Sequence, residues 1–203
     1  MSHRCRSLSL LAVTVASGLA ACSADNALAP AGDAALARKG PSTASAPAPS
    51  QRTARYEIDF MQDMIDHHAM AVMMAEMCVD KAVHKELRRL CEDIIAAQTA
   101  EIEQMQSWLQ EWYGLAYEPQ MKPADQRMMD RLAALSPEEF EIAFMQMMIE
   151  HHEKAVREGE TCLRRAYHPE LIELCENIIE TQTAEIELMQ EWLCEWYGIC
   201  QDE

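Results

Sequence analysis

The chain contains one sequence pattern twice, and the two copies align without a gap at a constant offset of 84 residues (His68 to His152). Residues 60–68 read FMQDMIDHH, and residues 144–152 read FMQMMIEHH. The same offset relates further pairs of cysteines, histidines and tryptophans: Cys78 and Cys162, His84 and His168, Cys91 and Cys175, Trp112 and Trp196. An ungapped duplication of this length predicts one helical unit that is built twice.

The spacing of apolar residues predicts long helices and no strands. In copy one, a stripe that recurs every three or four positions indicates a helix over residues 56–80 and a second over 85–113, with Gly114 as its stop. Copy two repeats both helices, and Ser136-Pro137-Glu138-Glu139 has the residue types of a helix start. We therefore predict an all-α fold, in which two antiparallel hairpins form a four-helix bundle with pseudo-twofold symmetry.

The predicted hairpins divide the chain into regular segments. The first hairpin covers residues 54–118, and the second covers 137–203. Prolines break the chain between them, so residues 119–136 form a linker, with one short helix expected over 124–135.

The N-terminal residues have the composition of an export signal and a tether. In residues 1–21, Arg4 and Arg6 precede an apolar run that is too short to span a bilayer. The sequence LAAC resembles the lipobox of bacterial lipoproteins, which implies cleavage before Cys22 and acylation of its thiol. An ordinary signal peptide is the alternative, and both interpretations export the protein. Residues 22–53 are rich in Ala, Pro and Ser, so we expect a disordered tether.

The net charge argues against one class of partner. The chain has 34 acidic and 17 basic residues, which gives a formal charge of −17 at pH 7. Such a surface repels phosphate backbones, so we expect no nucleic-acid binding. It also raises the local concentration of cations, although solubility alone explains the charge as well.

Six cysteines remain after Cys5 is removed with the signal and Cys22 is acylated. An even number in an exported protein predicts disulfide bonds. The repeat symmetry favours Cys78–Cys91 and Cys162–Cys175, each within one hairpin, and leaves Cys194–Cys200 to close the C-terminal end. Free thiolates that act as additional soft-metal ligands are the alternative.

Each copy places a histidine, a glutamine and a glutamate on stripes that are predicted to be buried. These residues are His68, Gln98 and Glu101 in copy one, and His152, Gln182 and Glu185 in copy two. Buried polar groups need partners, because an unsatisfied one costs about 1–3 kcal/mol. Two interpretations follow. The groups form a hydrogen-bond network that sets the register of the hairpin, or the imidazole binds a metal while its neighbours orient the ring.

The other histidine of each pair points elsewhere. His67 lies about 100° around the helix from His68, on a flank that it shares with several thioethers. The methionines of that side are Met70, Met73, Met74 and Met77. They predict a second, more exposed thioether site, and packing against the neighbouring hairpin is the alternative. The equivalent residues of copy two are Lys154, Arg157, Glu158 and Thr161. Such a site therefore belongs to copy one alone.

Taken together, these motifs resemble the bacterial family known as domain of unknown function 305. The shared pattern is FMxxMIxHH, an alanine three positions after the second histidine, and QxxEIxxMxxWL, within residues 56–114 and 140–198. The resemblance implies a ferritin-like arrangement of four helices in an exported protein, and some members are associated with copper or silver tolerance. By position it implies the following metal ligands: Met61, Met64, His67, His68, Met105, Met145, Met148, His151, His152 and Met189.

Paired imidazoles among thioethers are the donors that a soft monovalent ion such as Cu(I) or Ag(I) prefers. The leading hypothesis is an exported, lipid-anchored protein of the cell envelope, periplasmic or on the outer surface. It sequesters copper(I) or silver(I), or delivers the ion to a partner, without an organic cofactor and without enzymatic turnover. A di-iron oxidase is disfavoured, because no histidine follows a glutamate by three positions. A metal-free interaction or envelope-stress module is the alternative, and homo-oligomerisation is left open.

Overall fold

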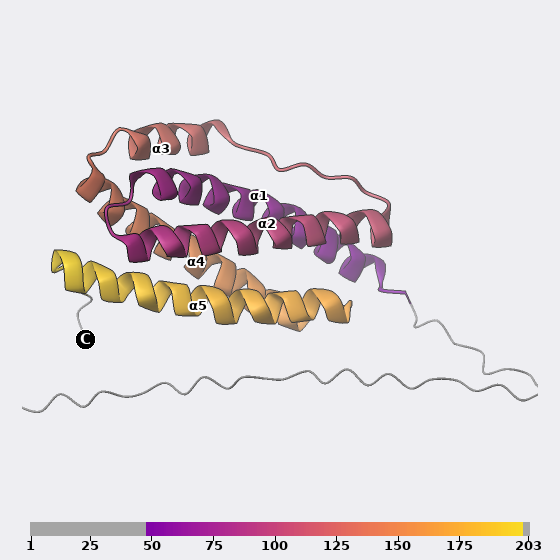
Figure 1. Ribbon diagram of the computed structural model, residues 1–203. Helices are drawn as coiled ribbons and strands as arrows, with labels where there is room; N and C mark the ends of the chain where they lie inside the picture. Colours follow the sequence, from indigo (N-terminus) through magenta and orange to yellow (C-terminus); the bar gives the residue numbers. More distant parts are fainter. Residues whose placement is uncertain (1–47, 201–203) are drawn as a thin grey trace, which may run out of the picture. The chain divides into compact units, whose positions relative to one another are not determined.

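The computed structural model describes residues 48–200 and has five α-helices in that range (Figure 1). Their bounds are α1 Gln51–Lys81, α2 Lys85–Tyr113, α3 Pro123–Ala133, α4 Pro137–Arg165 and α5 Pro169–Tyr197. Residues 48–200 contain no strand, and none of their helices has the length and apolar character of a membrane span. The prediction of an all-α bundle is confirmed. The predicted signal peptide, Cys22 and most of the tether lie outside the described residues.

The predicted helix bounds are confirmed for α2 and differ at two other places. α1 begins at Gln51, so residues 51–53, which were assigned to the tether, are helical. The N-cap is Ser50, whose Oγ accepts a hydrogen bond of 3.2 Å from the backbone N–H of Thr53. The short connecting helix is Pro123–Ala133 rather than 124–135, and its first residue is a proline, which suits that position because no helical hydrogen bond is lost there.

The two hairpins are α1 with α2 and α4 with α5, and they meet chiefly along α1 and α4 (Figure 1). The connecting helix α3 packs against the same two helices. Because α1 and α4 are the equivalent helices of the two copies, their junction brings equivalent residues face to face. A site at this junction needs both copies.

Both ends of each hairpin are fixed by local chemistry. Gly114 and Gly198 follow α2 and α5 with φ of 66° and 68°, a left-handed conformation that only glycine adopts readily. Near the turns, the disulfides Cys78–Cys91 and Cys162–Cys175 join the two helices of each hairpin, and Cys194–Cys200 closes the C-terminal end. The three predicted pairs are confirmed, and the alternative of free thiolate ligands is wrong for these six cysteines.

The core consists of two clusters, and each cluster contains side chains from both copies. One combines the later part of α1 with the start of α4, including Met74, Phe140 and Phe144. The other combines the start of α1 with the later part of α4, including Phe60 and Ala155. The hairpins are therefore held together by shared apolar burial along the α1–α4 junction.

Candidate metal centre

A pair of histidines occupies the middle of the α1–α4 junction. His67 of α1 and His151 of α4 stack face to face, with 3.5 Å between ring centroids and 24° between ring planes. Their four ring nitrogens are buried, and none of them has a hydrogen-bond partner among residues 48–200. Buried polar atoms normally have such partners. The pair therefore offers nitrogen lone pairs that no other side chain of the described fold uses.

Both rings of this pair are held neutral. Burial, with smaller contributions from His68 and Lys154, lowers the pKa of His67 to about 3. Burial and the facing His67 likewise hold the pKa of His151 well below its ordinary value of 6.5. At neutral pH each ring consequently keeps one nitrogen lone pair, which is the form of histidine that binds metal ions.

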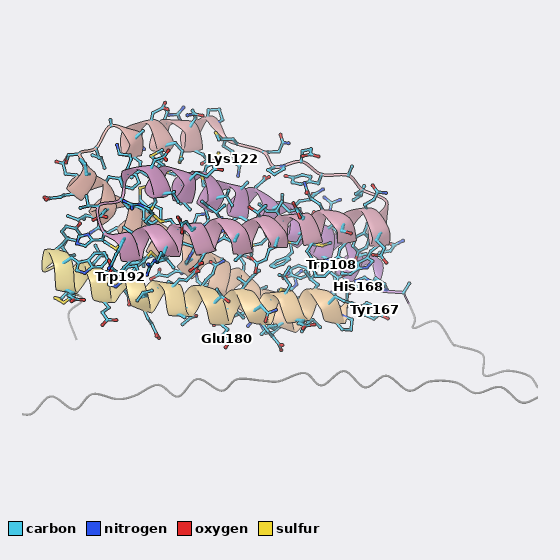
Figure 2. All side chains as sticks on the ribbon, in the orientation of Figure 1. Trp108, Lys122, Tyr167, His168, Glu180 and Trp192 are labelled. Atoms are coloured by element: carbon cyan, nitrogen blue, oxygen red, sulfur yellow. A yellow bond between two sulfur atoms is a disulfide. The ribbon has the colours of Figure 1, made fainter. Side chains whose placement is uncertain are left out.

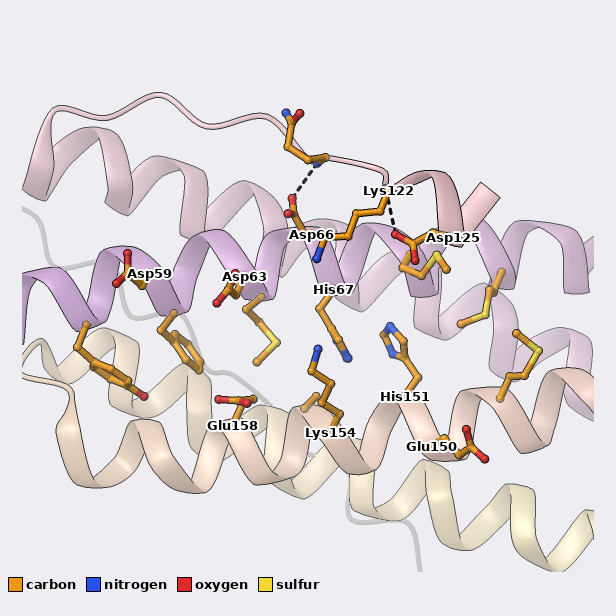
Figure 3. A pocket seen from close by; sticks show the side chains of 18 of the residues that line it. Asp59, Asp63, Asp66, His67, Lys122, Asp125, Glu150, His151, Lys154 and Glu158 are labelled. Carbon is orange, nitrogen blue, oxygen red and sulfur yellow. Dashed lines mark hydrogen bonds between the residues drawn. The ribbon is translucent and has the colours of Figure 1, made fainter. Parts of the chain in front are cut away.

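The pair lines a cavity of about 1030 Å³ between α1, α3 and α4 (Figure 3). Five thioethers share the cavity: Met64, Met70, Met74, Met128 and Met147. Charged side chains surround them, and Figure 3 shows the Lys154 side chain extending toward His67 and several carboxylates, among them Asp63 and Glu158, at the cavity wall. In residues 48–200 no three or more His, Cys, Asp or Glu side chains are grouped to hold a metal ion. The donors beside the imidazoles are thioethers.

The methionines of the predicted second thioether site are only partly brought together: Met74 is in a core cluster, and Met70, Met73 and Met77 pack against it. Met70 and Met74 do share a cavity with His67, but Met74 is 1% exposed rather than accessible. Met73 lines an adjoining groove instead. The sequence reasoning missed two cavity thioethers, Met128 and Met147. Met128 lies in α3, which has no equivalent in the repeat, and Met147 stands where copy one has an aspartate.

The second histidine of each pair contacts a glutamate of its own hairpin. Nε2 of His68 lies 2.7 Å from Oε2 of Glu101, and His152 and Glu185 show the same distance. Both rings are fully buried, and their centroids lie 6.3 Å from that of His67 and 6.1 Å from that of His151. Four imidazoles thus form a row across the junction, with a carboxylate at each end.

The buried glutamines do not complete this arrangement. Gln98 and Gln182 are buried, but their Oε1 atoms accept no hydrogen bond within residues 48–200. The predicted histidine–glutamate contact is therefore present, whereas the predicted link through the glutamine oxygens is absent from the described part of the chain.

The thioethers implied by the family pattern are divided between the two core clusters. Met61, Met64 and Met105 lie in one, and Met145, Met148 and Met189 lie in the other. All six are nearly or completely buried. Of these, Met64 lines the cavity of the histidine pair. The structure therefore brings together the histidines of both copies, but not each copy's full set of thioethers around that cavity.

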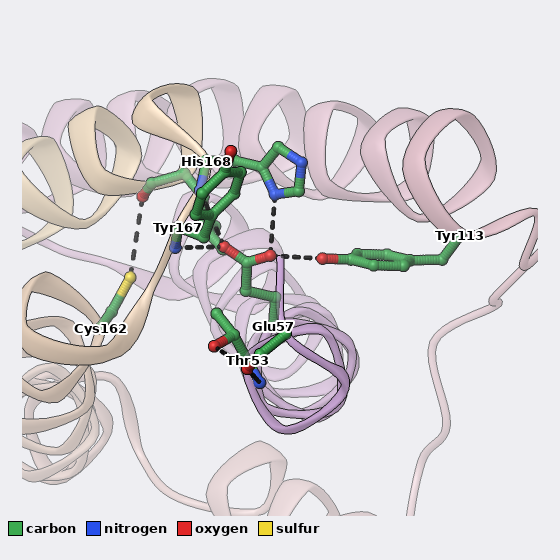
Figure 4. A network of polar contacts seen from close by, with 8 residues as sticks. Thr53, Glu57, Tyr113, Cys162, Tyr167 and His168 are labelled. Atoms are coloured by element: carbon green, nitrogen blue, oxygen red, sulfur yellow. Dashed lines mark hydrogen bonds and ion pairs between the residues drawn. The ribbon is translucent and has the colours of Figure 1, made fainter. Parts of the chain in front are cut away.

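Two buried glutamates fasten the hairpins at opposite ends of the junction. Oε1 of Glu57, in copy one, accepts hydrogen bonds from the backbone N–H groups of Tyr167 (2.7 Å) and His168 (3.0 Å) in copy two (Figure 4). Its Oε2 lies 2.8 Å from Nδ1 of His168 and accepts from the Tyr113 hydroxyl. Trp112 stacks on His168 at 3.9 Å between centroids. One carboxylate thus satisfies two backbone donors in the turn that immediately precedes α5.

Glu141 makes the reciprocal contacts. It accepts from the backbone N–H groups of Val83 (2.6 Å) and His84 (2.8 Å), and from the hydroxyl of Tyr197. Nδ1 of His84 lies 2.7 Å from its other oxygen, and Trp196 stacks on that ring. Burial alone would raise the pKa of both glutamates, but the hydrogen bonds outweigh it and the pKa values lie below 4.5.

The contacts of Glu57 and Glu141, which we call the two latches, were not predicted from the sequence, although a signal was present. Glu57 and Glu141 lie one helical turn before Met61 and Met145, on a stripe that is otherwise apolar. A carboxylate that recurs at equivalent positions of a buried stripe predicts a specific partner. The partners belong to the other copy, so periodicity within one helix does not reveal them.

Comparison with known proteins gives a family and several solved structures. The family model "Domain of unknown function (DUF305)" matches residues 57–193. CopM in its Cu(I)-bound form is 34% identical, with a TM-score of 0.63, over 70% of this chain and 98% of CopM. CopM co-crystallised with Ag is 35% identical, with the same TM-score and the same coverage of both chains.

A further solved structure belongs to the same family. A DUF305 protein from Streptomyces coelicolor, proposed to be secreted, is 28% identical, with a TM-score of 0.61, over 72% of this chain and 96% of that chain. Among curated proteins, no sequence matches this chain significantly.

Proposed function

This chain belongs to the DUF305 family, and from that premise we propose that it binds Cu(I) or Ag(I) at the junction of its two hairpins. The stacked pair of His67 and His151 carries the proposal, because its buried nitrogens lack partners in residues 48–200 and thioethers line the same cavity. Neutral imidazoles and thioethers are soft, uncharged donors, which suit a monovalent ion better than a hard divalent one.

The proposed site combines residues that the two copies contribute unequally. Copy one supplies Met64, Met70 and Met74 to the cavity, whereas copy two supplies Lys154 and Glu158 at the positions equivalent to Met70 and Met74. Nitrogen lone pairs lie in the plane of an imidazole ring, so the stacked rings present their faces to each other. We therefore expect ion binding to turn at least one of the two rings.

The His68–Glu101 and His152–Glu185 contacts support the pair from both sides. The hydrogen bond to Glu101 fixes the tautomer and the orientation of the His68 ring, and the Glu185 carboxylate lies at the same distance from His152. These inner rings in turn pack beside the pair that faces the cavity. In the proposal, His68 and His152 position the rings of His67 and His151, and their own remaining ring nitrogens stay available as metal ligands.

The comparisons support copper or silver as the cargo. CopM has been crystallised with Cu(I), Cu(II) and Ag bound, and its structure resembles this chain over most of its length. Export is supported by the secreted character proposed for the Streptomyces coelicolor relative. We propose a carrier or store of the ion rather than an enzyme, with lipid anchoring through Cys22 as the way in which it is retained at the membrane.

The test is a Cu(I) competition titration against a chromophoric chelator, with the purified protein and its disulfides intact. We expect tight binding in the parent and its loss in His67→Ala/His151→Ala. The matched control is Met77→Ala/Thr161→Ala, which truncates equivalent positions of α1 and α4 that do not line the cavity. Circular dichroism verifies that both variants stay folded. If the histidine variant binds Cu(I) as tightly as the parent, the proposal is wrong and a metal-free interaction module becomes the better hypothesis.

A further inference from the structure

A second hollow adjoins the cavity of the histidine pair. It is a groove of about 380 Å³ beneath the segment that connects α2 to α3. Three of its lining residues are methionines: Met70 and Met73 from α1, and Met121 from the connecting segment. Asp66, Met70, Gln120 and Asp125 line both hollows. These side chains form the boundary between the groove and the cavity of the histidine pair, so the two hollows are adjacent.

The thioethers at this boundary become more buried toward the histidines. Met121 is 44% exposed, Met70 and Met73 are half-buried, and Met74 in the inner cavity is 1% exposed. Met121 exposes apolar surface to solvent and does not contribute to the core, so burial does not explain a methionine at this position. Thioethers that extend from solvent to a buried imidazole are, by contrast, what a soft cation needs in order to enter without crossing an apolar layer.

Carboxylates hold and surround this groove. Asp66 accepts hydrogen bonds from the Tyr117 hydroxyl (3.0 Å) and the backbone N–H of Gln120 (2.7 Å), which attach the connecting segment to α1. Asp66, Glu76 and Asp125 all line the groove. Negative charge at its mouth raises the local concentration of cations.

Copy two has no equivalent set of methionines. The positions that match Met70 and Met73 hold Lys154 and Arg157, and Met121 lies in the connecting segment, outside the repeat. Cationic side chains repel a metal ion, so approach from that side is disfavoured. The methionines and carboxylates that line the groove itself all lie outside copy two.

We infer that Met70, Met73 and Met121 form an outer binding site for Cu(I) or Ag(I), through which the ion reaches the histidine pair. The inference rests on the proposed function and adds a site of entry to it. Three thioethers with nearby carboxylates bind a soft monovalent ion more weakly than a site that includes imidazoles. The outer site therefore captures the ion and releases it inward, through Met70 and Met74.

The test uses the purified protein with ¹³C-labelled methionine methyl groups, titrated with Ag(I) and observed by NMR. We expect the methyl signals of Met73 and Met121 to shift on addition of Ag(I). In Met73→Leu/Met121→Leu, total binding falls by about one equivalent and the rate at which the histidine pair is loaded falls about tenfold, as expected when a ligand site at the entrance is lost. These substitutions conserve volume, so the fold tolerates them.

The matched control is Met77→Leu/Met129→Leu, which removes two thioethers from the same parts of the chain but from neither hollow. If the Met73 and Met121 signals stay fixed while histidine-dependent binding persists, the outer site is refuted and the proposed function stands. If these signals shift equally in His67→Ala/His151→Ala, the outer site exists even though that variant lacks the inner one. If they shift but the rate of loading is unchanged in Met73→Leu/Met121→Leu, the groove is not the entrance.

Discussion

The two glutamate latches should be among the most sensitive positions of this fold. In Glu57→Ala the backbone N–H groups of Tyr167 and His168 lose their acceptor at the start of α5. An unsatisfied donor costs about 1–3 kcal/mol when buried; because these two are part-buried, their loss predicts a decrease of about 3 kcal/mol in the free energy of unfolding. The Tyr113 hydroxyl and the His168 ring are partly accessible, and water replaces their share of the contacts.

Glu57→Gln should decrease the free energy of unfolding less than Glu57→Ala, because the amide can keep most of the contacts. The amide oxygen can occupy the Oε1 position and accept both backbone N–H groups. The amide NH₂ then takes the Oε2 position, where the Tyr113 hydroxyl can rotate and the His168 ring can change tautomer to accept from it. We expect a loss of about 1–2 kcal/mol, because the remaining bonds no longer involve a charge.

Urea unfolding followed by tryptophan fluorescence measures both variants, and Trp112 reports directly because it stacks on His168. Glu141→Ala and Glu141→Gln should repeat the order, since the second latch has the same contacts. Glu180→Ala is the control: this glutamate is exposed on α5 and points away from the other helices (Figure 2). If Glu57→Ala costs no more than Glu180→Ala, or if the Gln and Ala variants are equally destabilised, the reasoning is refuted.

Two further predictions concern stability. The pKa values of His67 and His151 are depressed in the native state, so in the metal-free protein the unfolded chain binds protons that the native state excludes. The free energy of unfolding should therefore decrease below pH 6.5, by about 1.4 kcal/mol per pH unit for each histidine. The pKa values of Glu57 and Glu141 are lowered from 4.5, so their contribution is lost mainly below pH 5; urea unfolding between pH 6.5 and 5 therefore reports chiefly on the two histidines, and a flat profile there would contradict the burial argument. In Gly159→Ala the new Cβ would lie 2.9 Å from Cγ1 of Ile179, so we expect the free energy of unfolding to decrease by about 1–3 kcal/mol. An unchanged urea midpoint would show that α5 shifts to accommodate the methyl group without cost.

The sequence predicted those features whose signals are local or repeated. The bounds of α2 follow from a long apolar stripe that ends at Gly114, and the disulfides follow from cysteines at equivalent positions. The start of α1 was placed too late, because residues 51–55 carry no apolar stripe and the serine cap is the only signal there. Periodicity assigns a residue to a face of its own helix and says nothing about which other face it meets.

The histidine stack shows where this limit lies. Its position on a flank shared with Met70 and Met74 was predictable, because helical geometry alone places the three residues together. Its contact with His151 was not, since it depends on how the α1 of one copy crosses the equivalent helix of the other. The same holds for Glu57, whose partners lie 110 and 111 residues away in sequence. Both features arise only when the two hairpins associate.

Duplication followed by divergence explains why a nearly symmetric fold encloses an asymmetric cavity. The latches, the disulfides and the histidine row are equivalent in both copies, so the residues that hold the hairpins in register have been kept in pairs. The cavity wall differs, because copy one supplies thioethers where copy two supplies Lys154 and Glu158. Copy one therefore supplies three of the five cavity thioethers, and copy two adds only Met147. The methionine-lined groove beside the cavity is likewise formed by residues outside copy two, so the divergence of the copies places the additional soft donors next to α1.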